Sequence, residues 1–125
     1  MFLDHYWNWK DSRNRIRDAT WQLNVAFLLG YQGKLFKASQ HYRKAALLGV
    51  QPIIVSRIED FMSSIAASDR DKPQLYFCLG YFNLKIKGDK LRAAEDFRTF
   101  LKMSNQTQFP NETRLALKWI DEQKV

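Results

Sequence analysis

Cysteine, histidine and proline are scarce in this chain of 125 residues, which contains one, two and three of them. A single cysteine, Cys78, cannot form an internal disulfide. Its apolar surroundings, LYFCLGYF, predict a buried thiol rather than a nucleophile. His5 and His41 have no cysteine or carboxylate at metal-ligand spacing, so we expect no metal site.

Long apolar runs are also missing. No stretch approaches the roughly 18 apolar residues that a membrane-spanning helix needs. Residues 2–9, FLDHYWNW, lack the basic start and the apolar core of a signal peptide. We therefore expect a soluble, cytoplasmic domain without a membrane span, while a membrane-bound or catalytic part outside these residues stays open.

The common catalytic motifs do not occur. There is no glycine-rich phosphate loop, no Gly-x-Ser-x-Gly and no pair of carboxylates in an apolar setting. Asp69 and Asp71 form an Asp-x-Asp triplet, but it lies just before Pro73, where a solvated turn and helix cap is expected. We predict that this chain is not an enzyme and holds no catalytic residue, cofactor or metal; the prediction does not extend to a longer parent chain.

Acidic residues are outnumbered, with 13 Asp and Glu against 20 Lys and Arg and a net charge of +7. Such a balance is compatible with nucleic acid, an acidic partner or an anionic membrane surface. The basic residues are spread along the chain, however, and the densest cluster is only KDSRNRIR at 10–17. This distribution favours a uniformly basic, solvated surface.

Helical periodicity extends over nearly the whole sequence. Apolar residues recur at helical spacing, and each proline falls where a new apolar pattern begins, at 52, 73 and 110. The pattern predicts seven helices, at 6–18, 20–32, 35–48, 52–67, 73–87, 90–103 and 111–123. Because no segment shows the alternation of a strand, we predict an all-α domain.

A helical hairpin is present twice. Each copy has a turn glycine, then an alanine, and aromatic or small residues four and seven positions after that alanine: Gly33, Ala38, Tyr42 and Ala45, then Gly88, Ala93, Phe97 and Phe100. The glycine accepts the left-handed backbone of a tight turn, and the alanine permits close contact where the two helices cross. The spacing therefore predicts a duplicated helix–turn–helix unit.

At these residues the chain resembles the tetratricopeptide repeat family, whose repeat has about 34 residues. Ala26 and Gly80 match the small residue of the first helix of each repeat. The resemblance implies a right-handed array of antiparallel helix pairs. Three departures are visible: Ala38 and Ala93 are 55 residues apart, NLKIKGDKL holds one residue more than the pattern allows, and Phe100 replaces the last alanine of the second repeat. We therefore expect a single irregular domain over 1–125, with an N-terminal capping helix (1–19), repeat 1 (20–50), an intervening helix (52–70), repeat 2 (73–104) and a C-terminal capping helix (110–125).

The resemblance also implies a concave surface formed by the first helix of each pair. Its expected lining is Leu23, Phe27, Tyr31, Phe77, Tyr81, Leu84 and Lys85. Large side chains at such seams form anchoring pockets for a peptide, although the same residues could simply form the core between repeats. One subtype of the family binds a peptide's terminal carboxylate with polar groove residues, but here Leu23 and Phe27 occupy two of those places, so we do not expect that mode.

The amino-terminal segment is rich in aromatic residues. Tyr6, Trp7 and Trp9 are predicted to cover the first open face of the array or to form a dimer contact. The alternative is nucleic-acid binding, in which the aromatic rings stack on bases and the nearby cations neutralise phosphates.

Three functions follow from these observations. The leading prediction is a non-catalytic module that binds a protein or peptide, or forms a homodimer, in the manner of tetratricopeptide repeats. A second prediction comes from DHYWNWKD and LYFCLGYFNLKIKGDKLRAAEDFRTFL, which resemble the helical extension that follows the catalytic domain of some bacterial glycosyltransferases. That resemblance implies an accessory domain of a larger enzyme. Nucleic-acid binding through the amino-terminal segment is the third.

Overall fold

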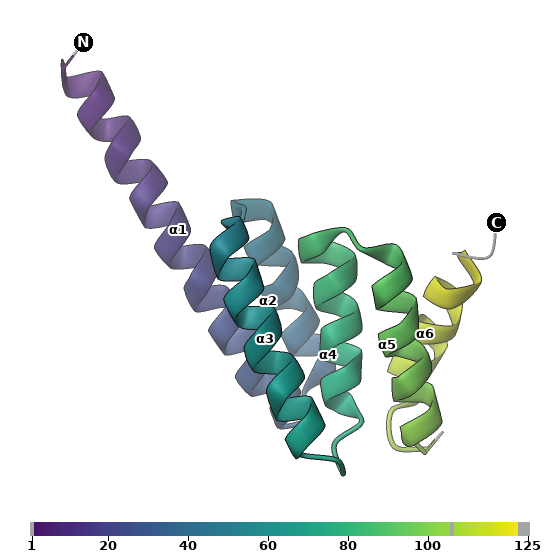
Figure 1. Cartoon of the computed structure of the whole chain (residues 1–125). Coiled ribbons are helices and arrows are strands. Elements are labelled where there is room, and N and C mark those ends of the chain that lie inside the picture. The colour runs from purple at the N-terminus through teal and green to yellow at the C-terminus, as the bar shows by residue number, and fades with distance from the viewer. Residues whose placement is uncertain (1, 106, 123–125) are drawn as a thin grey trace.

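All regular secondary structure in the described residues is helical. The structure is a computed structural model that describes residues 2–105 and 107–122, and no strand occurs in these ranges (Figure 1). Its elements are α1 (Phe2–Tyr31), α2 (Leu35–Leu48), α3 (Pro52–Ser68), α4 (Gln74–Phe82), the π-helical turn η1 (Asn83–Lys87), α5 (Lys90–Met103) and α6 (Pro110–Glu122). The prediction of an all-α fold is confirmed.

The first helix is longer than the sequence predicted. Instead of two helices at 6–18 and 20–32, α1 is a single helix of 30 residues. Nothing at the expected break stops a helix: Ala19 is buried, and the hydroxyl of Thr20 donates to the Ile16 carbonyl at 2.9 Å, within the same helix. The capping helix expected at 1–19 is therefore the first part of α1, which extends past the packed body of the molecule (Figure 1). The predicted contacts of Tyr6, Trp7 and Trp9 lie outside the residues whose side chains the structure describes.

The two predicted hairpins are formed by α1 with α2 and by α4–η1 with α5. Gly33 and Gly88 have φ angles of 84° and 70°, in the left-handed region that a glycine adopts without strain. The other residues singled out by the repeated spacing are all in the core: Ala26, Ala38, Tyr42, Ala45, Gly80, Ala93, Phe97 and Phe100. Packing between the helices of each pair thus follows the residues that the sequence marked.

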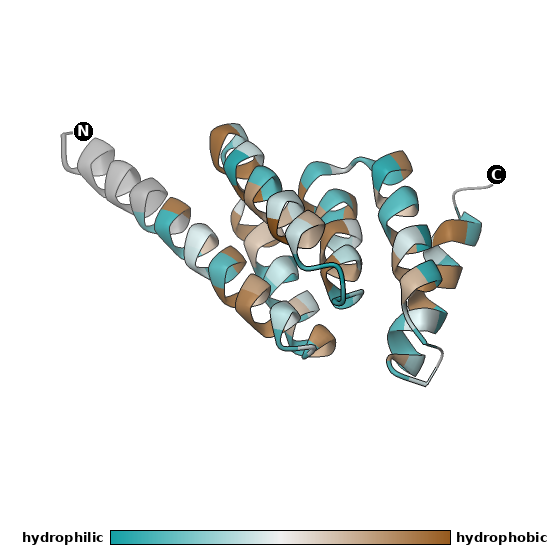
Figure 2. Ribbon diagram, turned by 60° about the horizontal axis from the view of Figure 1, so that its bottom comes forward, coloured by the Kyte–Doolittle hydropathy of each residue, from teal (hydrophilic) through white to brown (hydrophobic). Residues whose placement is uncertain are grey.

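Helix α4 is the centre of the fold. All but one of its nine residues are buried, as expected for a helix that is apolar on every side. Tyr42 of α2 lies against Tyr81 and Phe82 of α4, with ring centroids 6.1 and 6.4 Å apart, and so joins the first hairpin to the second. The peripheral helices have one apolar side, and Figure 2 shows hydrophobic and hydrophilic residues alternating along α3 and α5.

Helix α3 packs against both α1 and α4. Phe61 meets Phe27 of α1 at a centroid distance of 5.1 Å. At the end of α3, the hydroxyl of Tyr31 donates to Asp69 Oδ2 at 2.7 Å, and Gln74 Nε2 donates to the Tyr31 carbonyl at 3.1 Å. These two hydrogen bonds attach the loop between α3 and α4 to the carboxyl end of α1.

The extra residue of the second repeat is taken up by a π turn. Helix α4 continues without a break into η1, where the backbone N–H of Gly88 donates to the carbonyl of Asn83, five residues earlier. A π turn closes over more residues than an α turn and so admits an insertion without ending the helix. The helix predicted at 73–87 therefore corresponds to α4 followed by η1.

Candidate partner-binding groove

The described side chains form no cluster that could hold a metal ion. Among residues 14, 16–105 and 107–122, no three His, Cys, Asp or Glu side chains come together in this way. Within the same ranges, no helix combines the length and apolar character needed to cross a bilayer. Asp69 of the Asp-x-Asp triplet is the C-cap of α3, where its backbone N–H donates to the Ile65 carbonyl at 2.9 Å, and its carboxylate accepts the hydrogen bond of Tyr31.

The surface expected along the first helices of the two pairs is divided into two parts. Leu23 is completely buried, so its predicted place on an open face is wrong. Phe27 and Tyr31 line a shallow pocket together with Leu28, Ile65, Ser68 and Asp69. Because α3 packs on this part of α1, these residues face α3 and not a surface shared with α4.

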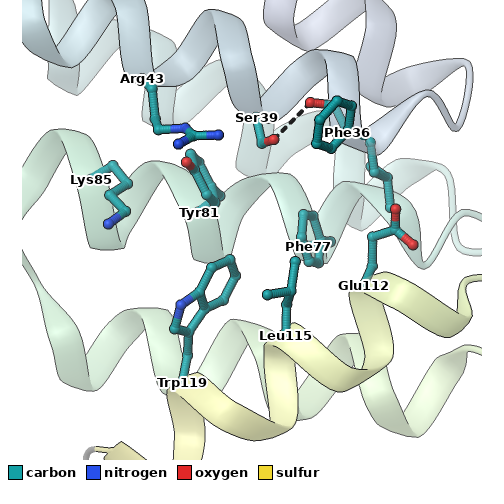
Figure 3. Close-up of a pocket in the computed structure, with 10 residues that line it drawn as sticks. Phe36, Ser39, Arg43, Phe77, Tyr81, Lys85, Glu112, Leu115 and Trp119 are labelled. Atoms are coloured by element: carbon teal, nitrogen blue, oxygen red, sulfur yellow. Dashed lines mark hydrogen bonds between the residues drawn. The ribbon is translucent and has the colours of Figure 1, made fainter.

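The other part of the predicted surface lies in a groove across α4. The groove is lined by Leu35, Phe36, Ser39 and Arg43 of α2, Phe77 and Tyr81 of α4, Lys85 of η1, and Glu112, Leu115 and Trp119 of α6 (Figure 3). We call it the α2–α6 groove. Leu84, also expected on this face, is half-buried against the core and does not line the groove.

Helical spacing explains how three separate segments contribute to the groove. Each helix presents residues three or four positions apart, such as Phe77, Tyr81 and Lys85, which lie on one side of a helix. Helices α2, α4 and α6 are separated along the chain by α3 and α5. Because each of these two helices brings the chain back, α2, α4 and α6 run in the same direction. As a result, Arg43 and Lys85 lie toward one end of the groove and Glu112 toward the other (Figure 3).

The floor of the groove is a rigid aromatic cluster. Phe77 and Tyr81 are 3% and 4% exposed and are stacked with an interplanar angle of 20°. The indole of Trp119 lies 6.0 Å from Phe77, 5.6 Å from Tyr81 and 4.8 Å from Phe97, measured between ring centroids. Such contacts hold the rings in place before any partner binds.

The rim carries exposed apolar side chains. Phe36 is 67% exposed and Leu115 is 41% exposed. Both also line an adjoining hollow, together with Asn111, Arg114 and Lys118. Exposed large apolar residues that are close together and bordered by polar ones are typical of interaction sites.

Charge and hydrogen-bonding capacity are concentrated at one end. Burial raises the pKa of Tyr81, while the positive charge of Arg43 opposes this change, so the phenol is neutral and its hydroxyl is a donor at neutral pH. Neither Arg43 nor Lys85 forms an ion pair with any residue in the described part of the chain. Lys87 of η1 differs, because its Nζ lies 2.6 Å from Glu59 Oε2.

The groove has a volume of about 230 Å³. Pockets for small molecules and cofactors are typically larger, roughly 300–1,000 Å³. The space is instead suited to one large side chain of another polypeptide. Together with the apolar rim, it gives the arrangement by which a protein binds a peptide segment.

Comparison with known proteins identified no relative of this chain. No protein-family model, no curated protein and no solved structure matches this chain. The interpretation of the groove therefore depends on its own geometry.

Seven of the ten residues that line the groove were outside the predicted binding face, among them three that are important for its rim and charge. Phe36, Arg43 and Leu115 lie on the second helix of a pair or on the last helix, where the family resemblance implied packing and not binding. The available signal was the spacing of Phe36, Ser39 and Arg43, which places them on one helical face. Only the position of α6 shows that this face borders a groove.

Proposed function

We propose that the chain is a protein-interaction module that binds a segment of another polypeptide in the α2–α6 groove. The observation that carries the proposal is the combination of a rigid aromatic floor with two exposed apolar residues on its rim, Phe36 and Leu115. Interface hot spots have this composition: large side chains in a well-packed pocket, bordered by polar residues.

The preformed floor favours binding energetically. Phe77, Tyr81 and Trp119 are held by one another, so a bound segment does not have to order them. The main cost is the ordering of the partner's own chain. A short segment with one large anchor keeps this cost small relative to the apolar area that it buries.

The experiment is a selection from a display library of short random peptides on the purified protein, followed by affinity measurements. Phe36→Asp and Leu115→Asp place a charge on the groove rim and should weaken binding of the selected peptides by about tenfold or more. Leu47→Asp and Leu91→Asp are matched controls, because these leucines are 89% and 77% exposed and do not line the groove.

The outcomes separate the alternatives. If the selected peptides bind all four variants equally well, the groove is not the binding site and the proposal fails. Sedimentation equilibrium of the isolated protein tests the other form of the prediction, a homodimer. A dimer that Phe36→Asp dissociates would assign the groove to contact between two copies instead of a peptide.

A further inference from the structure

The charges around the α2–α6 groove are unevenly placed, and this asymmetry bears on the chemistry of the bound segment. Arg43 and Lys85 come from different elements, α2 and η1, and lie near Tyr81 (Figure 3). The adjoining hollow adds Arg114 and Lys118, and the groove contains one acidic residue, Glu112. The surface that a segment would contact is therefore mainly positive.

The side chains of Arg43 and Lys85 can donate hydrogen bonds to a bound segment. Both side chains are exposed, and neither forms an ion pair within the described residues. The hydroxyl of Tyr81 supplies a third donor beside them. A carboxylate placed here would accept charge-assisted hydrogen bonds, which are about twice as strong as neutral ones.

The apolar part of the groove lies next to these donors. Trp119 lies opposite Tyr81, Phe77 and Leu115 lie further along the groove, and Glu112 follows at the far end (Figure 3). A carboxylate near Glu112 would be repelled, whereas one near Arg43 and Lys85 would be attracted. The order of the groove is thus a positive end, an apolar middle and a single negative charge.

We infer that the α2–α6 groove binds an acidic peptide segment in which a large apolar side chain is adjacent to carboxylates. The apolar side chain enters the space over Phe77, Leu115 and Trp119, and the carboxylates lie against Arg43 and Lys85. This inference depends on the proposed function and adds to it the chemical class and the orientation of the partner.

A peptide fits the groove better than a nucleic acid does. Base stacking needs open ring faces, but Phe77 and Tyr81 are almost entirely covered by neighbouring side chains. A nucleic-acid track also needs cations along its length, whereas here the cations lie at one end of the groove and Glu112 lies at the other. The carboxylates of a short peptide need only one positive end.

The test uses defined synthetic peptides. The first contains a tryptophan flanked by aspartate and glutamate; in the second the acids are replaced by asparagine and glutamine; in the third they are replaced by lysine. We expect the wild-type protein to bind the acidic peptide roughly tenfold more tightly than the amide peptide, and the lysine peptide more weakly still. A single-stranded oligonucleotide is the fourth probe.

Charge variants assign the preference to the groove. Arg43→Gln and Lys85→Gln should each reduce affinity for the acidic peptide by several-fold, with little effect on the amide peptide. Lys44→Gln and Lys102→Gln are the matched controls, since both lysines are exposed and outside the groove. The double variant R43E/K85E should reverse the preference and bind the lysine peptide best.

Failure of this inference differs from failure of the proposed function. Equal binding of the acidic and amide peptides, with both still weakened by Leu115→Asp, would overturn the inference and leave the groove as a peptide site. Peptide binding that is indifferent to Leu115→Asp would overturn both. Tight oligonucleotide binding that Arg43→Gln and Lys85→Gln abolish, without binding of the acidic peptide, would assign the groove to nucleic acid.

Discussion

Gly80 of α4 and the ring of Phe97 in α5 meet without room for a side chain between them. A Cβ atom on Gly80 would lie 2.6 Å from Cε1, 2.7 Å from Cδ1 and 2.9 Å from Cζ of Phe97. The ring cannot move aside easily, because it is 1% exposed and lies 4.8 Å from Trp119 and 5.7 Å from Phe77 between centroids. The second hairpin therefore depends on a glycine where its helices cross.

Gly80→Ala should lower the free energy of unfolding by about 1–2 kcal/mol, because overpacking outweighs the gain in helix propensity of about 1 kcal/mol. Denaturant titration measures the change. Phe97→Leu provides the matched background, since removal of the ring should make Gly80→Ala neutral or stabilising. An unchanged or higher stability of Gly80→Ala in the wild-type background would show that the contact between the helices relaxes at little cost.

The sequence predicted most of the helix boundaries because glycine and proline act locally. Gly33 and Gly88 take positive φ angles at the expected turns, and Pro52 begins α3. The break expected near Ala19 was wrong because no such residue is present there, and a buried alanine continues the helix. The one-residue insertion after Gly80 could be counted, but local pattern did not reveal that it would form a π turn and not a longer loop.

The candidate site was only partly predictable because it depends on how distant helices pack. Phe77, Tyr81 and Lys85 were expected on a binding face, and they line the groove. Leu23 is completely buried, Phe27 packs on Phe61 of α3, and Tyr31 bonds to Asp69 just after α3; no local periodicity encodes this packing. Trp119 was outside the predicted set, since its contact with α4 depends on the path of the chain after α5.

The thiol of Cys78 should be inert in the folded protein. Its residue is 1% exposed, and burial raises its pKa to about 12, so the reactive thiolate is almost absent at neutral pH. Iodoacetamide should leave the native protein unmodified under conditions that fully label the chain in concentrated guanidinium chloride, as read by mass spectrometry. Native labelling as fast as that of a small free thiol would mean that the core around α4 opens readily.

Tyr31→Phe should loosen the loop between α3 and α4 without affecting the α2–α6 groove. The substitution removes the donor to Asp69, whereas the hydrogen bond from Gln74 to the Tyr31 carbonyl can persist. We expect faster hydrogen exchange at the backbone amides of Asp69 and Lys72. Tyr76→Phe is the control, because the Tyr76 hydroxyl has no hydrogen bond in the described structure. Equal exchange in the two variants would show that the loop is held by other contacts.

Asn83 of the π turn and Asp96 of α5 form a polar pair in which Asn83 is buried and Asp96 is half-buried. Asn83 is 1% exposed, and its Nδ2 donates to Asp96 Oδ2 at 2.6 Å. Burial raises the pKa of Asp96 from 3.8 to about 6, and the nearby Glu95 and Glu59 add to the shift. The hydrogen bond from Asn83 and the charge of Arg92 oppose it without cancelling it. Ionisation of the Asp96 carboxylate therefore costs more free energy in the folded state than in the unfolded state.

Asp96→Asn should remove one component of the pH dependence of folding. Because the folded pKa is above the unfolded one, the folded state binds more protons between pH 3.8 and about 6, and the contribution of Asp96 to stability falls as pH rises through this window. The amide oxygen of the variant still accepts from Asn83. The difference in unfolding free energy, variant minus wild type, should thus increase from about pH 4 to about pH 7, while the other carboxylates cancel in the comparison. A difference that stays constant with pH would show that Asp96 titrates as an ordinary exposed carboxylate.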